Sequence, residues 1–150
     1  MPRTPPTTTT IDRAEELVAI FEELQSTGSG WLNIVPELPE GTEVPATPNS
    51  LAIFSRRGPV VPLATWTTTE PTELGLLHGT SQRARFALAD TVAAIPDGWR
   101  VLADHPRKGL VVVPGAGLGH RVVARWLLDA LTVLCLPPHT GRFVVARYPG

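Results

Sequence analysis

The stretch Gly98–Cys135, GWRVLADHPRKGLVVVPGAGLGHRVVARWLLDALTVLC, contains the segments that decide the fold. Trp99–Ala103 and Leu110–Val113 flank the polar turn Asp104–Gly109, which is the pattern of a β-hairpin. Leu110–Val113 is apolar without alternation, and such a run is typical of a strand covered on both faces. The stretch therefore predicts a hairpin whose second strand lies inside a sheet.

The same stretch ends in an apolar helix. Gly119–Leu134 follows a glycine-rich turn and precedes Pro137-Pro138, which cannot continue a helix. Arg121, Arg125 and Asp129 recur every four residues along its expected solvent side. The expected inward positions are Val122, Val123, Trp126, Leu127, Ala130, Leu131 and Leu134. We expect this helix to cover the sheet.

The N-terminal part predicts a tail followed by a helix. Residues 1–10, MPRTPPTTTT, have the low complexity of a flexible tail. Ile11–Thr27 shows helical periodicity, Asp12 and Glu15 fit a capping box, and Gly28 ends the helix. The apolar stripe consists of Ile11, Ala14, Leu17, Val18, Phe21 and Leu24.

Short β-branched and aromatic segments predict further strands. These are Trp31–Val35, Leu51–Ser55, Val60–Thr69, Glu73–His78 and Thr140–Tyr148. The second and third should form a hairpin around Arg56–Pro59, and Pro62 predicts an edge or bulged strand because proline cannot donate to a ladder. A further helix is expected to run to about Ala94, with Thr80 or Ser81 as its N-cap.

Together these segments predict one α+β domain over residues 11–150, preceded by the tail at residues 1–10. The expected architecture has two layers, a mainly antiparallel sheet of about six to seven strands with two hairpins, and three helices mostly on one face.

Composition restricts the classes of protein. The chain has 150 residues, of which 43% are hydrophobic, and no apolar run approaches the roughly 20 residues of a membrane-spanning helix. Residues 1–10 lack the apolar segment of a signal peptide. The single cysteine, Cys135, excludes an internal disulfide. We therefore expect a soluble cytoplasmic protein with no membrane partner.

The charges are distributed unevenly along the chain. Residues 1–75 carry four basic and ten acidic side chains, whereas residues 76–150 carry nine basic and four acidic ones. Such a dipolar chain can associate with itself or attract an anionic ligand, or its two halves can neutralise each other within one fold. The basic half lacks the strongly positive, aromatic-interleaved pattern of a nucleic-acid binder, so no nucleic-acid partner is expected.

The hairpin turn Asp104–Lys108 is the first candidate site. Asp104 could orient His105 as a general base, and Arg107 with Lys108 could hold an oxyanion. Alternatively, Asp104 caps the turn and the cations are solvated. Adjacent residues at a hairpin tip rarely face one pocket, which favours the structural interpretation.

The loop Gly115–His120 is the second candidate. A glycine-rich connection from a strand to a helix can cradle a phosphate on free N–H groups, through Gly115, Gly117, Gly119 and His120. The spacing G-x-G-x-G is neither the dinucleotide fingerprint nor a P-loop. A tight turn that needs positive φ explains the same glycines.

The third candidate is His78 with Arg83, at the start of the expected second helix. Its N–H groups and Arg83 could bind a carboxylate or phosphate. Cys135 and His139 lack a second pair of ligands, so neither a metal nor another cofactor is expected.

The sequence favours a small binding, adaptor or regulatory protein that acts through protein–protein contacts, with a homodimer as the expected assembly, over an enzyme. The alternative is an enzyme or binder for a small phosphorylated or carboxylated metabolite, which uses the histidine and arginine clusters and the glycine-rich loop.

Overall fold

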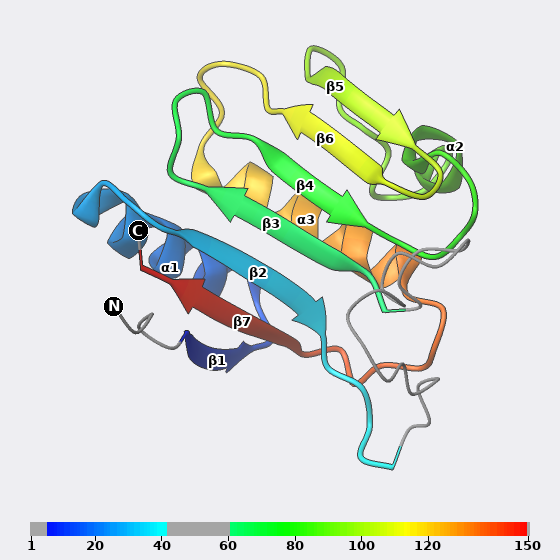
Figure 1. The fold of residues 1–150 in the computed structure, drawn as a ribbon, viewed down its shortest axis with the longest axis horizontal. Helices are drawn as coiled ribbons and strands as arrows, with labels where there is room; N and C mark the ends of the chain where they lie inside the picture. Colours follow the sequence, from blue (N-terminus) through cyan, green and yellow to red (C-terminus); the bar gives the residue numbers. More distant parts are fainter. Residues whose placement is uncertain (1–5, 42–60, 150) are drawn as a thin grey trace.

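The computed structural model describes residues 6–41 and 61–149, which form an α+β fold (Figure 1). The elements in chain order are β1 (Thr7–Ile11), α1 (Ala14–Thr27), β2 (Trp31–Pro36), β3 (Leu63–Thr67), β4 (Leu74–Leu77), α2 (Ala84–Leu88), β5 (Arg100–His105), β6 (Gly109–Val113), α3 (His120–Leu134) and β7 (Phe143–Tyr148). The predicted strand Leu51–Ser55 and turn Arg56–Pro59 lie outside the described residues.

Within the described residues, seven strands form one sheet in the order β1-β7-β2-β3-β4-β6-β5, and every neighbouring pair is antiparallel. The predicted hairpin of the opening stretch is confirmed as β5–β6, with His105 opposite Gly109. The predicted α+β class is therefore confirmed, with an antiparallel sheet and, in the same described residues, three helices.

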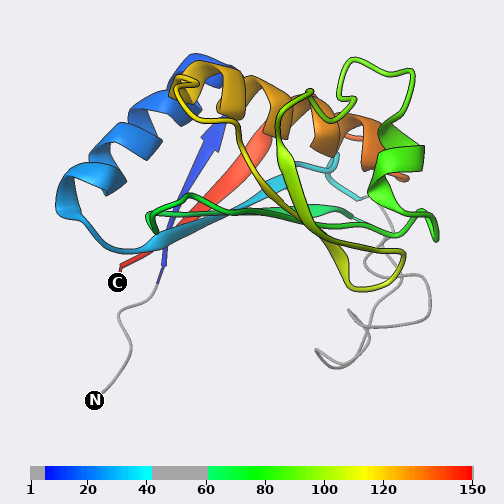
Figure 2. The same ribbon diagram turned by 90° about the horizontal axis from the view of Figure 1, so that it is seen from above.

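The core lies between the sheet and the two long helices. Figure 2 shows α1 and α3 side by side on the same side of the sheet. The Phe21 ring of α1 stacks on Trp66 of β3 at 4.4 Å between ring centroids. In α3, Trp126 is buried and its Nε1 donates to the Ala93 carbonyl at 3.0 Å. The predicted inward stripe of α3 is buried except for Val122, which is 45% exposed because it lies at the margin of the apolar face.

The segment predicted as a tail contains a strand. Thr7–Ile11 forms β1 and pairs with β7 from Thr7 opposite Arg147 to Ile11 opposite Phe143. Ile11 is 2% exposed and fixes the end of the strand in the core. The expectation was wrong for these residues because the pairing partner lies at the other end of the chain, where local composition gives no sign of it.

Helix α1 begins later than predicted, at Ala14, and the proposed capping box is wrong in detail. The side chain that reaches back is Glu16, whose Oε1 accepts the N–H of Asp12 at 3.2 Å. The predicted end is confirmed, since Gly28 adopts the left-handed conformation with φ 78°.

Strand β3 lies in the interior of the sheet, so the expected edge strand around Pro62 is wrong. β3 pairs with β2 on one side and β4 on the other. Pro62 precedes the first strand residue, Leu63. Its missing N–H therefore removes no bond from the ladder.

Helix α2 is much shorter than predicted and has a different cap. It spans only Ala84–Leu88, whereas a helix from Thr80 or Ser81 to about Ala94 was expected. Ser81 has φ 65°, which is incompatible with the extended backbone of an N-cap. The Thr80 hydroxyl instead lies 2.9 Å from Nδ1 of His78.

Candidate functional site

Asp104, predicted as the partner of a catalytic histidine, caps helix α2. Its Oδ1 accepts the Ala84 N–H at 2.8 Å, and its Oδ2 accepts both the N–H and the Nε–H of Arg85 at 3.2 Å. The carboxylate is nearly buried, with a side chain 3% exposed. Two helix N–H groups and a guanidinium thus satisfy this carboxylate, which favours a structural role over an orienting role in catalysis.

The side chain of His105 accepts hydrogen bonds from its own turn. Its Nδ1 accepts the N–H groups of Arg107 and Lys108 at 3.0 and 3.1 Å. An imidazole nitrogen that accepts hydrogen bonds carries no proton, so the ring proton is on Nε2. This geometry matches the structural alternative, in which the polar residues of the turn stabilise the turn itself. The side chain of His105 is exposed.

His78 is buried, with 1% of its surface exposed. Its Nδ1 lies 2.9 Å from Thr80 Oγ1, and its Nε2 has no hydrogen-bond partner among the described residues. Burial lowers the pKa of His78, and the nearby negative charge of Asp104 opposes this shift. The Asp104 carboxylate that caps α2 is thus near enough to the buried imidazole of His78 for its charge to act on it.

Two of the three predicted anion sites, the hairpin turn and the glycine-rich loop, lie at opposite ends of β6. The turn Asp104–Lys108 precedes this strand, and the loop Gly115–His120 follows it (Figure 1). The four residue steps from Gly109 to Val113 span about 13 Å in a strand. Arg107 and Lys108 therefore belong to the end with His78 and Arg83, and the glycine-rich loop forms a separate site.

The glycine-rich loop borders a cavity of about 660 Å³. The walls also come from the β3–β4 turn, the start of β5 and the end of α1. The lining residues are Gln25, Trp66, Glu70, Pro71, Thr72, Gly98, Arg100, Val113, Pro114, Gly115, Ala116, Gly117, Leu118, His120 and Val123. Of the residues predicted for an anion, Gly115, Gly117 and His120 line this cavity.

The first turn of α3 faces this region without an acidic cap. Gly119 is its N-cap residue and has no side chain that could cap the helix start, and the first turn contains no acidic residue. Gly117 has φ 81°, a conformation that glycine adopts without strain. His120 is held by edge contacts with Phe21 and Trp66, at 5.7 and 6.3 Å between ring centroids.

Arg100 and Glu70 line the same cavity and were not identified from the sequence. Neither belongs to a motif. Arg100 lies beside the loop through strand pairing, whereas Glu70 lies in the turn between β3 and β4. Arg100 is the first residue of β5 and lies opposite Val113, the last residue of β6 before the loop. The predicted hairpin contained this information, because a hairpin places the start of its first strand beside the end of its second.

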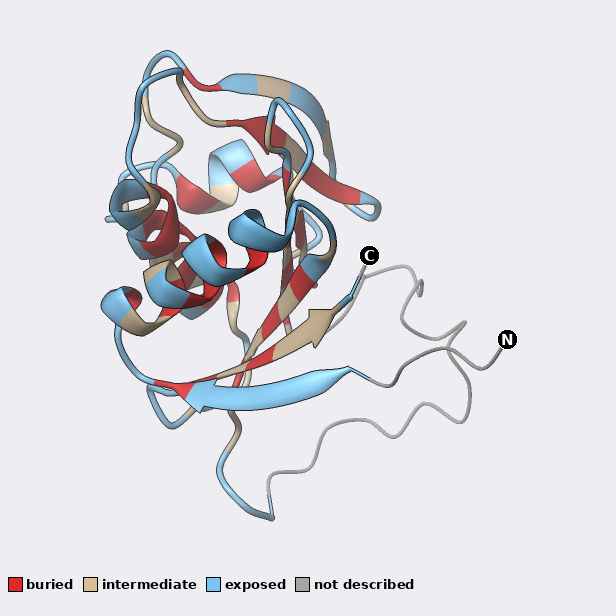
Figure 3. Ribbon diagram, turned by 90° about the vertical axis from the view of Figure 1, so that its left-hand side faces the viewer, coloured by how far each residue is buried: buried red, intermediate tan, exposed pale blue. Residues whose placement is uncertain are grey.

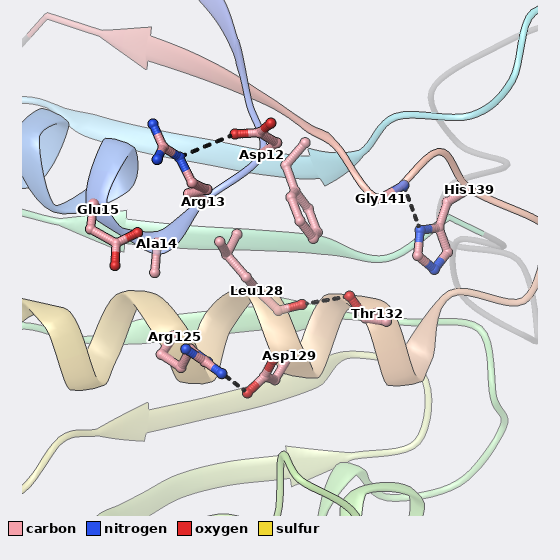
Figure 4. A pocket seen from close by; sticks show the side chains of 11 residues that line it. Asp12, Arg13, Ala14, Glu15, Arg125, Leu128, Asp129, Thr132, His139 and Gly141 are labelled. Carbon is pink, nitrogen blue, oxygen red and sulfur yellow. Dashed lines mark hydrogen bonds and ion pairs between the residues drawn. The ribbon is translucent and has the colours of Figure 1, made fainter.

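A second hollow of about 370 Å³ lies between the start of α1, the middle of α3 and the segment before β7 (Figure 4). Ala14, Leu128 and Phe143 contribute apolar surface. The cations pair with neighbouring carboxylates, such as Arg125 with Asp129 at 3.8 Å. The mixed, mutually paired charges give this hollow no preference for one sign of ligand.

Strand β1 forms one edge of the sheet. It pairs with β7 on one side, and among the described strands none lies on its other side. Thr7–Thr10 are exposed on both faces, and Figure 3 shows β1 exposed along most of its length beside β7. The five residues TTTTI carry no charge and no proline.

The opposite edge, β5, differs in ways that protect an edge strand. Arg100, Asp104 and His105 are charged or polar, and the register shifts between Val101 and Ala103, so that Leu102 is bulged. Charges and bulges are the usual devices that prevent edge-to-edge pairing. β1 lacks both devices, which makes it the more open of the two edges.

Comparison with known proteins gives no relative for this chain. No family model, no curated protein and no solved structure matches it. Helices in the described ranges are all too short or too polar to cross a bilayer. Residues 6–41 and 61–149 contain no cluster of side chains suited to a metal ion.

Proposed function

We propose that this chain is a protein-binding module and that its binding element is the edge strand β1. The observation that carries the proposal is the outer side of Thr7–Ile11, which pairs with no other described strand. The strand is uncharged, Thr7–Thr10 are exposed, and the buried Ile11 fixes its end in the sheet. An extended segment that pairs with such an edge gains main-chain hydrogen bonds along its whole length. This is binding by strand addition.

The geometry of the predicted catalytic residues supports binding over catalysis. Asp104 caps a helix and Nδ1 of His105 is occupied by backbone N–H groups. His78 is buried with a lowered pKa, which favours its neutral form. Each of these arrangements stabilises the fold and requires no substrate.

The single cysteine favours a reducing compartment, and we place the protein in the cytoplasm.

Site-specific photo-crosslinking tests the proposal. A photoreactive phenylalanine analogue at Thr9 should capture a defined protein in the cells that produce this chain, because Thr9 is on the free edge. The matched control carries the analogue at Ala103 on β5, which is also exposed. A single species captured at Thr9 and absent at Ala103 supports the proposal. The same background of species at both positions contradicts it.

A second function is favoured by one observation, the cavity beside Gly115–His120. Its volume of about 660 Å³ is within the range of small-molecule sites. Its walls include Arg100, His120 and the start of α3, whose N–H groups favour an anion. The ligand class would be a small phosphorylated or carboxylated metabolite.

Thermal-shift measurements test this second function. A panel of phosphorylated and carboxylated metabolites should include a compound that raises the melting temperature, because a ligand at many times its Kd stabilises the fold. The shift should shrink in Arg100→Ala and persist in Arg107→Ala, at the other end of β6. No shift across the panel, or equal losses in both variants, argues against a ligand in this cavity.

A further inference from the structure

We infer that the partner of β1 is a second copy of the same chain, paired antiparallel through Thr7–Ile11 so that both sheets become continuous. This inference rests on the proposed function and names the partner. The two-fold axis would pass beside Thr9, which then lies opposite Thr9 of the second copy. Symmetric pairing of this kind uses the same surface twice, as in most homodimers.

The ends of β1 match those of a second β1. Pro6 directly precedes the strand and cannot donate to a ladder, and the start of α1 follows it after two residues. The segment available for pairing is therefore Thr7–Ile11 in either copy. In an antiparallel arrangement centred on Thr9, the two segments have the same length and the same limits.

The side chains of β1 are compatible with this register. Thr8 would lie opposite Thr10 of the second copy, and cross-strand threonine pairs stabilise sheets through their methyl and hydroxyl groups. No charge faces a like charge, since Thr7–Ile11 is uncharged. At the end of the strand, Asp12 pairs with Arg13 of its own chain at 3.7 Å, and Arg13 also pairs with Glu16 at 3.8 Å.

The β5 edge does not offer the same match. Pairing β5 with its copy would have to accommodate the bulged Leu102. It would also have to place Arg100 and Asp104 within a new ladder, although Asp104 already binds the start of α2. The two edges of one sheet thus differ, and the chain pairs through one of them. A closed dimer results, because both copies use the same edge, β1, for the pairing.

The interface is small, since five residues on each side contribute fewer contacts than a standard protein interface. We therefore expect a reversible dimer that forms as concentration rises. Sedimentation equilibrium over about 5 to 500 µM of the full chain covers the range of weak complexes. The average mass should rise from one chain toward two, whereas a constant monomer mass over this range would overturn the inference.

Charge swapping at β1 locates the interface. Thr8→Lys with Thr10→Lys places lysines opposite lysines across the two-fold axis, and Thr8→Glu with Thr10→Glu does the same with glutamates. Each double variant should be monomeric, because like charges directly opposite destabilise a strand pair. A mixture of the two should restore a heterodimer. Both threonines are exposed, so the monomer fold should be unchanged in circular dichroism.

The matched control is Leu102→Lys with Ala103→Lys, which adds the same charge to the exposed β5 edge. It should dimerise like the unaltered chain. Equal loss in the control, or lysine and glutamate variants that still dimerise alone, would overturn the inference. If the unaltered chain is monomeric but the Thr9 crosslink captures a different protein, self-pairing is refuted and the proposed binding function stands. If neither is observed, both fail.

Discussion

The Asp104 cap allows a direct test of how a side chain distant in sequence determines the start of α2. Asp104→Ala removes the acceptor of three hydrogen bonds, two from backbone N–H groups and one from Arg85. Loss of an N-cap costs about 0.5–2 kcal/mol, and hydrogen bonds to charged groups lie toward or above the upper end of this range. Because the carboxylate is nearly buried, water does not readily replace it. We expect the free energy of unfolding to fall by about 2–3 kcal/mol.

Urea denaturation of the unaltered chain, Asp104→Ala, Asp104→Asn and Arg85→Ala measures these contributions. Asparagine keeps one acceptor oxygen and should lose about half as much stability as alanine. The Arg85 side chain is 53% exposed, so its removal should cost less than about 1 kcal/mol. Two results would refute the reasoning: an alanine variant within about 0.5 kcal/mol of the unaltered chain, or an Arg85→Ala loss as large as that of Asp104→Ala.

Three further predictions concern buried positions. Gly109→Ala should destabilise the fold by about 3 kcal/mol or more in urea titrations, because a Cβ would lie 2.3 Å from the Leu76 carbonyl oxygen and φ is 93°. Trp126→Phe should cost about 1–2 kcal/mol by the same assay, since it removes the bond from Nε1 to Ala93. The pKa of His78 is lowered in the fold, so on acidification the imidazole is protonated in the unfolded chain before it is protonated in the folded chain. The free energy of unfolding should therefore be at its full value above about pH 6.5 and should fall below it, by up to about 1.4 kcal/mol per pH unit. His78→Gln should reduce this slope in urea titrations repeated from pH 7.5 to pH 5.

The sequence was most informative where local periodicity and burial coincide. The hairpin β5–β6 and helix α3 were predicted because Leu110–Val113 and Gly119–Leu134 contain their own apolar patterns. Helix α1 followed from the same rule, and Gly28 identified its end. In these segments the residues that form the element also determine which face is buried.

Prediction failed where the deciding contact is distant in sequence. The start of α2 depends on Asp104, twenty residues beyond Ala84, so Thr80 and Ser81 were misleading as caps. Pro62 suggested an edge strand because the sequence does not show that the strand begins one residue later, at Leu63. In contrast, the predicted hairpin already implied that the turn Asp104–Lys108 and the glycine-rich loop are far apart, because its second strand lies between them.

β1 shows how one buried residue can determine the role of an otherwise featureless segment. Thr7–Thr10 have the composition of a tail, yet β-branched residues are also suited to a strand that has a partner. Ile11 supplies the anchor, because its burial in the core aligns the preceding threonines with β7. The same alignment leaves the other side of the strand without a neighbour among the described residues. A segment that gains order from one partner strand can gain more from a second, and this property connects the fold of the chain to its proposed function.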